Sequence, residues 1–347
     1  MAKHLTEKQR IELETLYRLG YSRREMAAFL NCSIRTIYYE LARGKCEQID
    51  GKTWRTYHTY SSMIAQKKHD ENATAKGRSL KLGNNHAFAN YLEQKIGKEK
   101  YSPRAALAAL HIENKDFNIT VSHTTIYRWI YQGYLSIDNS NLPEGRRPKK
   151  DKEPNSKKPI IPNKSIELRP KEIEIRSTLG HWEFDTVIGK RDGKHSCLLV
   201  FTERKTSVEL IYKLKSKSPK ETVRIIDNIQ NKLNNRFSKL FQTLTCDNGR
   251  EFWDWKGIEK NNRTTLYYCH PYSSWERPQN ERANRLIRRF IPKGKSINDY
   301  SDDEIKRIQN WMNHYPRASL GWQRPIDVFT KELKSIGLDC SILQDLF

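Results

Sequence analysis

The sequence lacks the long hydrophobic runs of a membrane protein. No apolar stretch approaches the roughly 20 residues that cross a bilayer as a helix. The first residues, MAKHLTEKQR, also lack the apolar stretch of a secretory signal and open directly into a helical pattern. We therefore expect no membrane partner and no secretion.

Closely spaced cysteines are also missing. The six cysteines, Cys32, Cys46, Cys197, Cys246, Cys269 and Cys340, are scattered singly, without the spacing of a zinc knuckle or a redox motif. A structural zinc site is therefore not expected, and a reducing cytosol is the simplest compartment.

Acidic residues are few relative to basic ones. The 63 Lys and Arg residues exceed the 41 Asp and Glu residues by 22 charges. The electrostatic field of this net positive charge favours the binding of polyanions such as DNA or RNA. Charge alone leaves open a ribosome-associated protein, or one that is merely basic.

Residues 1–50 read as three short helices with a tight turn between the last two. Thr6 and Gln9 form a capping-box pattern, Ser22 and Glu25 form a second, and Ser33 caps the third helix. Two short helices joined in this way predict a helix-turn-helix. The third helix places Ile34, Ile37, Tyr38 and Leu41 on its inner face. The residues expected to face DNA are Arg35, Thr36, Tyr39 and Arg43. A helical bundle with a solvated polar face is the alternative.

The pattern recurs at residues 100–140. Ser102-Pro103 opens one helix and Ser122 caps the next, so a second helix-turn-helix is predicted. Its outer face carries His123, Thr125 and Arg128 as DNA-binding candidates. Residues 51–99 are interpreted as a helical connector, with the aromatic stretch Trp54–Arg78 mostly helical. Residues 141–174, rich in Pro, Lys and Arg, have the composition of a linker.

Residues 175–347 have the pattern of an α/β domain. GHWEFDTVIG, HSCLLVFTERK and VELIYKL each read as a strand, an amphipathic helix follows Ser218-Pro219, and further strands and helices alternate after it. This order predicts a mixed sheet with helices on both faces.

Three acids lie where that domain could hold metal ions. Asp185 is in the first strand, Asp247 follows the strand Thr243–Cys246, and Glu281 begins a helix. Two divalent cations roughly 4 Å apart, held by such carboxylates, support phosphodiester chemistry. Hard oxygen ligands suit Mg²⁺ or Mn²⁺. By spacing alone, the same acids could be surface charges.

Several residues near these acids could assist them. Alternation along the first strand puts His181 and Glu183 on the face of Asp185, where either could support the site. Asn248 and Gly249 would shape the turn beside Asp247, and Asn280 would orient the helix of Glu281 or merely cap it. The candidates for phosphate contacts are Arg285, Arg288, Lys293 and Lys295.

The strings GHWEFDTVIG, TLTCDNGREF and HPYSSWERPQNERANRLIRRFIPKG together resemble the catalytic signature of bacterial transposases of the insertion sequence thirty family. Asp247 and Glu281 have 33 residues between them (281 − 247 − 1), as in that family. The runs at 5–44, 102–135 and 313–329 are similar to it as well. Phe184, Pro278-Gln279 and Arg282 depart from the family pattern without removing an acid.

The resemblance implies helix-turn-helix N-terminal domains followed by a ribonuclease-H-like DDE catalytic domain over residues 175–347. It implies Asp185, Asp247 and Glu281 as catalytic and metal-binding residues for two Mg²⁺ ions, with Mn²⁺ as a substitute. The implied partners are double-stranded DNA, as terminal inverted repeats and target, and a second copy of the chain. The implied location is the bacterial cytoplasm, on the nucleoid when DNA is bound. A regulator with an inactive catalytic domain, and an integrase or nuclease of another mobile element, remain alternatives.

Overall fold

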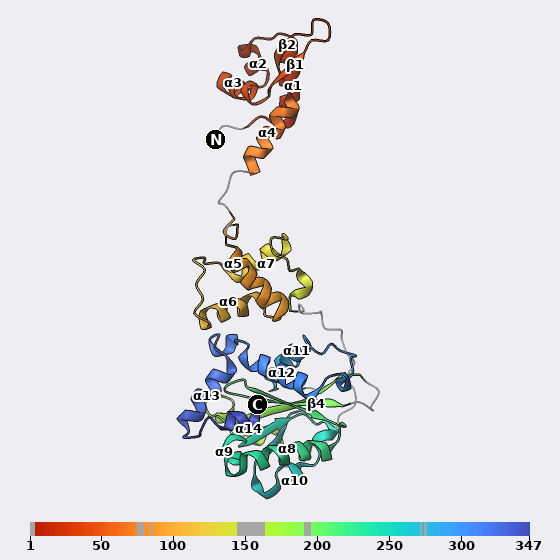
Figure 1. The fold of residues 1–347 in the computed structure, drawn as a ribbon, viewed down its shortest axis with the longest axis vertical. Coiled ribbons are helices and arrows are strands. Elements are labelled where there is room, and N and C mark those ends of the chain that lie inside the picture. Colours follow the sequence, from red (N-terminus) through yellow and green to blue (C-terminus); the bar gives the residue numbers. More distant parts are fainter. Residues whose placement is uncertain are drawn as a thin grey trace. The chain divides into compact units, whose positions relative to one another are not determined.

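The computed structural model describes residues 4–74, 80–83, 85–143, 164–190, 196–270, 273 and 276–347. The chain divides into two units, Met1–Gly83 and Asn84–Phe347, which are drawn in Figure 1. The predicted linker at 141–174 falls largely outside the described residues. Within the part that is described, no helix has the length and apolar composition to span a membrane.

The first unit is built on three short helices, α1 (Glu7–Arg18), α2 (Arg23–Phe29) and α3 (Ile34–Arg43). Both predicted capping boxes are present, and the side chain of Ser33 accepts a hydrogen bond from the backbone of Thr36. The buried residues include Leu13, Met26 and Ile37, one from each helix. The local signals in the sequence therefore set the ends of these helices, and their apolar faces form a small core.

A β-hairpin follows α3 directly. Its strands are β1 (Lys45–Ile49) and β2 (Thr56–Tyr60), and α4 (Ser62–Thr74) completes the unit. The prediction that Trp54–Arg78 is mostly helical is wrong for β2, because the Thr-Tyr-His-Thr-Tyr run consists largely of residues that favour strands. Residues 75–79 lie outside the described residues. The expected inner face of α3 also changes, since Ile34 and Tyr38 are exposed and Glu40 is buried instead.

The second unit begins with another group of helices. These are α5 (His86–Glu93), the π-helix η1 (Gln94–Lys98), α6 (Pro103–Ile112) and α7 (His123–Tyr131). Ser102 and Ser122 cap α6 and α7 as predicted, and Ile126, Trp129 and Ile130 are buried. The stretch interpreted as a connector thus supplies the second strand of the hairpin and a helix to the first unit, and two helical segments to the second.

A five-stranded mixed sheet forms the centre of the rest of this unit. Its strands are β3 (His181–Ile188), β4 (Cys197–Glu203), β5 (Glu209–Leu214), β6 (Thr243–Cys246) and β7 (Thr265–Tyr268). Their order is β5-β4-β3-β6-β7, antiparallel among the first three and parallel from β3 to β7. Helix α8 and helices α11 and α12 lie on opposite sides of the sheet in Figure 1. The predicted α/β arrangement is confirmed.

The α-helices of this part are α8 (Pro219–Leu233), α9 (Phe237–Leu240), α10 (Trp255–Ile258), α11 (Pro278–Ile287), α12 (Asp302–His314), α13 (Pro325–Ser335) and α14 (Ile342–Leu346). Short 3₁₀ turns occur at Asn139–Asn141, Ile166–Leu168, Lys171–Ile173, Asn234–Arg236, Arg250–Phe252, Lys260–Asn262, Ile297–Asp299 and Ala318–Leu320.

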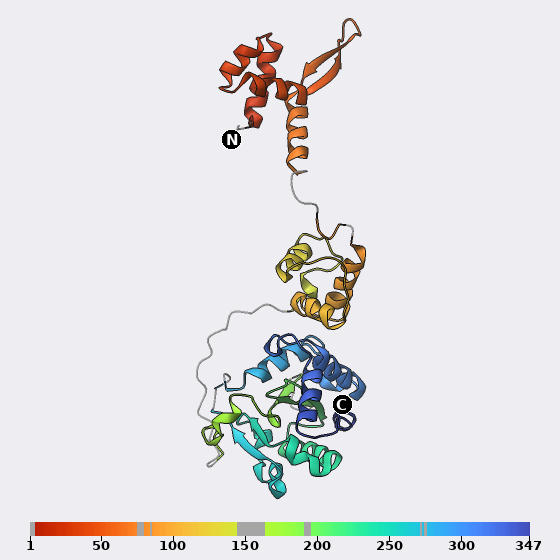
Figure 2. The same ribbon diagram turned by 90° about the vertical axis from the view of Figure 1, so that its left-hand side faces the viewer.

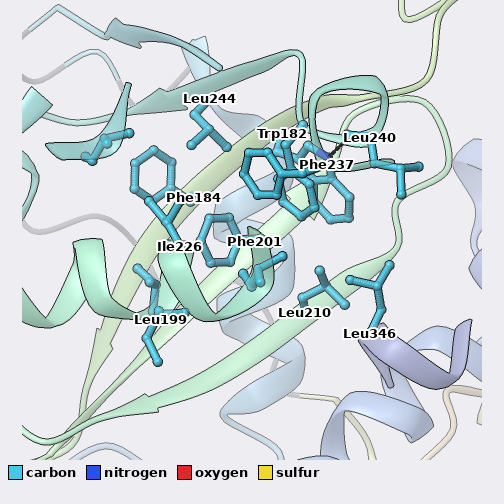
Figure 3. Close-up of a cluster of buried hydrophobic side chains, with 14 of the residues drawn as sticks. Trp182, Phe184, Leu199, Phe201, Leu210, Ile226, Phe237, Leu240, Leu244 and Leu346 are labelled. Atoms are coloured by element: carbon cyan, nitrogen blue, oxygen red, sulfur yellow. Dashed lines mark hydrogen bonds between the residues drawn. The ribbon is translucent and has the colours of Figure 1, made fainter. Parts of the chain in front are cut away.

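Aromatic side chains from the sheet and the helices of one face fill the core, as Figure 3 shows. The rings of Trp182 and Phe241 stack with their centroids 4.7 Å apart, and the indole nitrogen of Trp182 donates to the carbonyl of Leu240 at 2.6 Å. Phe184 stacks on Phe201 across β3 and β4. This packing fixes β3 at the centre of the sheet, and β3 carries the first candidate acid.

Helix α12 covers the free edge of the sheet. The side chain of Asn313 accepts from the backbone nitrogen of Glu209 and donates to its carbonyl, both at 2.8 Å. Gln309 accepts from the backbone nitrogen of Ile211 at 2.6 Å. Side-chain amides thus replace the neighbouring strand that β5 lacks, which protects an edge that could otherwise pair with another chain.

Candidate active site

Asp185 in β3 and Asp247, which directly follows β6, lie opposite each other on two neighbouring parallel strands. His181 pairs with Thr243 and Glu183 with Thr245, a constant offset of 62 residues (243 − 181). Two residues further along, the same offset brings Asp185 opposite Asp247. The register of β3 and β6 therefore puts the first two predicted acids side by side.

Each aspartate is held by local hydrogen bonds. One oxygen of Asp185 accepts from the backbone nitrogen of Thr186 at 2.8 Å, and the other accepts from the amide of Asn284 at 3.1 Å. Asp247 accepts from the backbone nitrogen of Gly249 at 2.9 Å. Burial raises the pKa of Asp185, and the like charge of Asp247 adds to that rise, while Arg277 opposes it. Two carboxylates that lie this close together are stabilised in their charged form by a nearby positive charge.

Arg277 supplies part of the missing positive charge. Its guanidinium lies 3.6 Å from the outer oxygen of Asp247 and donates to the carbonyl of Phe184 at 3.1 Å. Burial lowers the pKa of Arg277, but the charges of Asp185 and Asp247 outweigh it, and the net shift is upward. Only 11% of the Arg277 side chain is exposed, against 48% for Asp247. A largely buried cation therefore lies beside Asp247, whose carboxylate is about half open to solvent.

Glu281 is in the first turn of α11, and its side chain is exposed. Among the described residues, no three His, Cys, Asp or Glu side chains are gathered as they would be around a metal ion. Glu281 is nevertheless near the pair along its helix. Asn284, which contacts Asp185, is three residues later on the same face, about 4.5 Å along the axis.

A fourth acid, Glu251, was missed from the sequence. It is buried, accepts from the hydroxyl of Thr186 at 2.7 Å and pairs with Lys217 at 2.9 Å. A Cβ placed on Gly249 would lie 2.7 Å from Glu251 and 2.9 Å from Asp247, so both carboxylates crowd the same glycine. Its position four residues after Asp247, in the same turn, was the available signal.

The two residues that share the strand face of Asp185 have structural partners. His181 bridges the hydroxyls of Thr243 and Thr178, and burial together with nearby arginines lowers its pKa to about 4. Glu183 is fully buried and forms an ion pair with Arg204. The neutral ring of His181 and the paired carboxylate of Glu183 stabilise β3.

The three residues expected to shape the site, Asn248, Gly249 and Asn280, are all buried. Asn248 donates to the carbonyl of Cys269 at 2.6 Å, and Gly249 leaves no room for a side chain. Asn280 is 4% exposed. The N-cap of α11 is Arg277, so the idea that Asn280 caps the helix is wrong.

The basic residues predicted to contact phosphates differ in their exposure and in their hydrogen bonds. Arg285, Lys293 and Lys295 are exposed. Arg288 donates to the carbonyl of Ile188 at 2.7 Å, and burial lowers its pKa. Arg288 and Lys293 also line a hollow of about 500 Å³ beside Thr186, the neighbour of Asp185. Two positive side chains, Arg288 and Lys293, therefore lie close to the strand residue that follows Asp185.

Three of the seven helix-turn-helix candidates are exposed, and the other four are half-buried. On α3, Arg35 and Tyr39 are exposed and hydrogen-bonded to each other at 3.1 Å, while Arg43 is paired with the buried Glu40. Thr36 is half-buried and bonded to Ser33. On α7, Arg128 is exposed, whereas His123 and Thr125 are half-buried.

Comparisons with known proteins find relatives over nearly the whole chain. A helix-turn-helix domain family matches residues 2–44. The transposase for insertion sequence element IS4351 of Bacteroides fragilis is 32% identical over 95% of this chain and 96% of its own length. The probable transposase for insertion-like sequence element IS1161 of Streptococcus salivarius is 30% identical, over 94% of each chain. Transposase InsI for insertion sequence element IS30A of Escherichia coli (strain K12) is 26% identical, over 94% of this chain and 84% of the relative.

Among solved structures, the catalytic core domain of BIV integrase is similar over 45% of this chain and 97% of that chain, with 14% identity and a TM-score of 0.34. The predicted fold class is confirmed in its N-terminal helix-turn-helix domain and in the α/β domain with a mixed sheet that follows. The extent and identity of the insertion-sequence relatives carry the assignment: this chain belongs to the family of insertion-sequence DNA transposases that includes those of IS4351 and IS30.

Proposed function

We propose that this transposase uses Asp185, Asp247 and Glu281 to hold two Mg²⁺ ions, for which Mn²⁺ can substitute. The observation that supports this most strongly is the pairing of Asp185 with Asp247 against the buried guanidinium of Arg277. Carboxylate oxygens are the ligands that such hard cations prefer. Bound there, the two ions would activate the attacking oxygen and stabilise the leaving 3′ oxygen.

The surrounding residues would hold the acids in position. Thr186 and Asn284 fix the two oxygens of Asp185, and Gly249 fixes one oxygen of Asp247. The amide oxygen of Asn284 is buried without a hydrogen-bond partner among the described residues. Glu281 would join the aspartates when DNA draws the first turn of α11 inward.

Two successive displacements at phosphorus would follow. Water attacks the phosphodiester at the element end, and the bond to the 3′ oxygen breaks to leave a 3′-hydroxyl and a 5′-phosphate. That 3′-hydroxyl then attacks a second phosphodiester, whose own 3′ oxygen departs. No covalent protein–DNA intermediate is needed, so no catalytic Ser or Tyr is assigned.

The remaining parts of the chain would bind and assemble the DNA. Helix-turn-helix elements at residues 1–50 and 100–140 would bind the terminal inverted repeats, and the linker at 141–174 would connect them to the catalytic domain at 175–347. Arg285, Arg288, Lys293 and Lys295 would contact phosphates. Two element ends have to meet, which requires at least a dimer, and the reaction would take place on the bacterial nucleoid in the cytoplasm.

Asp247→Asn should abolish cleavage and joining while leaving DNA binding intact, because the amide cannot supply the negative charge that holds a cation. The measurement is strand cleavage and joining of a labelled element-end duplex with Mg²⁺, compared with binding of the same duplex. If wild type binds the ends and cuts none of them, the regulator with an inactive catalytic domain becomes the better assignment.

Arg277→Gln should bind Mn²⁺ about tenfold more tightly than wild type, since the guanidinium no longer competes for Asp247. That factor corresponds to about 1.4 kcal/mol and is measurable by titration calorimetry without DNA. Lys217→Gln is the matched control, because that cation pairs with Glu251. Equal or weaker Mn²⁺ binding by the Arg277 variant would contradict the competition.

A further inference from the structure

The β1–β2 hairpin of the first unit is the largest described feature that the proposed function leaves without a role. Its strands pair from Lys45 with Tyr60 to Ile49 with Thr56. Figure 2 shows it extending away from the three-helix core. Five pairs at about 3.3 Å each give a reach of roughly 16 Å.

The base of the hairpin is fixed to the end of α3. Tyr60 is 2% exposed and belongs to the core of this unit. A Cβ on Gly44, the residue that ends α3, would lie 2.4 Å from the Tyr60 ring, and Ser61 donates to the carbonyl of Gly44 at 2.9 Å. The hairpin therefore keeps a set orientation relative to the helix whose outer face carries Arg35 and Tyr39.

The tip of the hairpin is ordered by its own hydrogen bonds. Asp50 accepts from the backbone nitrogen of Lys52 at 2.9 Å and from the hydroxyl of Thr53 at 2.8 Å. The backbone nitrogen of Asp50 donates to the carbonyl of Arg55 at 2.9 Å, and the backbone nitrogen of Trp54 donates to the carbonyl of Asp50 at 2.8 Å. The turn thus uses its only carboxylate internally and leaves Lys52, Trp54 and Arg55 facing outward.

The outward side chains are unusual for a surface that contacts only water. Trp54 is 82% exposed, the highest value among the large hydrophobic residues of the described chain, and Ile49 next to the turn is 62% exposed. Lys52 and Arg55 flank this apolar tip. Cationic side chains around an apolar wedge are the combination that proteins use to enter the minor groove of DNA.

We propose that this hairpin is a second DNA contact, with Trp54 and Arg55 at its tip entering the minor groove next to the major groove occupied by α3. A helix about 10–12 Å across fills the major groove, so a ribbon attached to its end can reach only the adjacent groove. The contact continues the interface of the helix-turn-helix. It requires that this unit bind the element end, but it is independent of the cleavage chemistry.

The test is the affinity of the full chain for a fluorescent duplex of its own element end, without Mg²⁺ so that no cutting occurs. Trp54→Ala should weaken binding about tenfold, and Arg55→Gln should lower the salt slope by about one unit. Netropsin, a minor-groove ligand, should weaken wild-type binding and have little further effect on Trp54→Ala. Leu19→Ala, which removes a side chain 68% exposed at the end of α1, should bind as wild type does.

Wild-type affinity in Trp54→Ala would overturn the proposal, and loss of self-association in that variant would assign the tip to a protein partner instead. Arg35→Ala separates this failure from that of the proposed function. If Arg35→Ala loses affinity while Trp54→Ala does not, only the hairpin contact is wrong. If neither loses affinity, binding of the ends by the whole unit is wrong as well.

Discussion

Glu281→Gln is expected to reduce strand cleavage and joining by about a thousandfold or more, equivalent to about 4 kcal/mol of barrier. The variant should bind the element end as wild type does. The reason is that two ions between paired aspartates need a third carboxylate, and Glu281 lies about one helical turn from the residue that contacts Asp185. The measurement is the single-turnover rate on a labelled duplex with Mg²⁺ at saturating protein.

Glu251→Gln provides the decisive comparison, because Glu251 is the other carboxylate near Asp247. Its bonds to Thr186 and Lys217 give it a structural role, so its loss should lower stability more than the chemical rate. Asp303→Asn, at an exposed acid in the first turn of α12, controls for the loss of one surface charge. If the Glu251 variant loses most of its rate and the Glu281 variant keeps a normal rate, Glu251 and not Glu281 is the third metal-binding carboxylate.

Arg10→Met is expected to destabilise the first unit by about 3–4 kcal/mol, because it leaves the buried carboxylate of Glu40 with only the partly exposed Arg43 as its partner. Arg10 is 1% exposed, and its Nε lies 2.6 Å from Glu40 of α3, which is itself 3% exposed. Its Nη1 donates to the side-chain oxygen of Gln66 of α4 at 2.6 Å. The measurement is hydrogen exchange of the amides in residues 7–43 of the full chain, where exchange should accelerate by two to three orders of magnitude.

The double variant Arg10→Met with Glu40→Leu tests the cause of that loss. Replacing both members of a buried ion pair by apolar residues of similar size is often neutral or stabilising. Exchange in the double variant should therefore return close to the wild-type rate. If the double variant is as unstable as the single one, packing rather than the unpaired charge explains the loss.

Elements with local signals could be predicted from the sequence. The capping boxes at Thr6 and Ser22 are present, and the alternation around Asp185 gives β3. The β1–β2 hairpin was missed because its strands are almost entirely exposed, and no apolar face gives them a recognisable period. Tyr38 was placed inward by helical spacing, but a cation–π contact with Arg23 holds it on the surface.

The acid pair was predictable because each aspartate belongs to a strand with a clear pattern. The roles of Arg277 and Asn284 were not, since they depend on where α11 lies across β3. Those residues contact Phe184 and Asp185 over separations of 93 and 99 positions, which no local pattern reports. Glu251 was overlooked because its burial depends on Thr186 and Lys217, which belong to other parts of the sheet domain.

The division of the chain into two units also sets the order in which its parts can fold during synthesis. The first unit makes its core from residues before Gly83, whereas the catalytic sheet needs β6 beside β3 and helix α11, which ends at Ile287. At 5–20 residues per second, the 204 residues between those points (287 − 83) take roughly 10 to 40 s to emerge from the ribosome. The helix-turn-helix unit of a newly made chain can therefore fold while the sheet domain is still being translated.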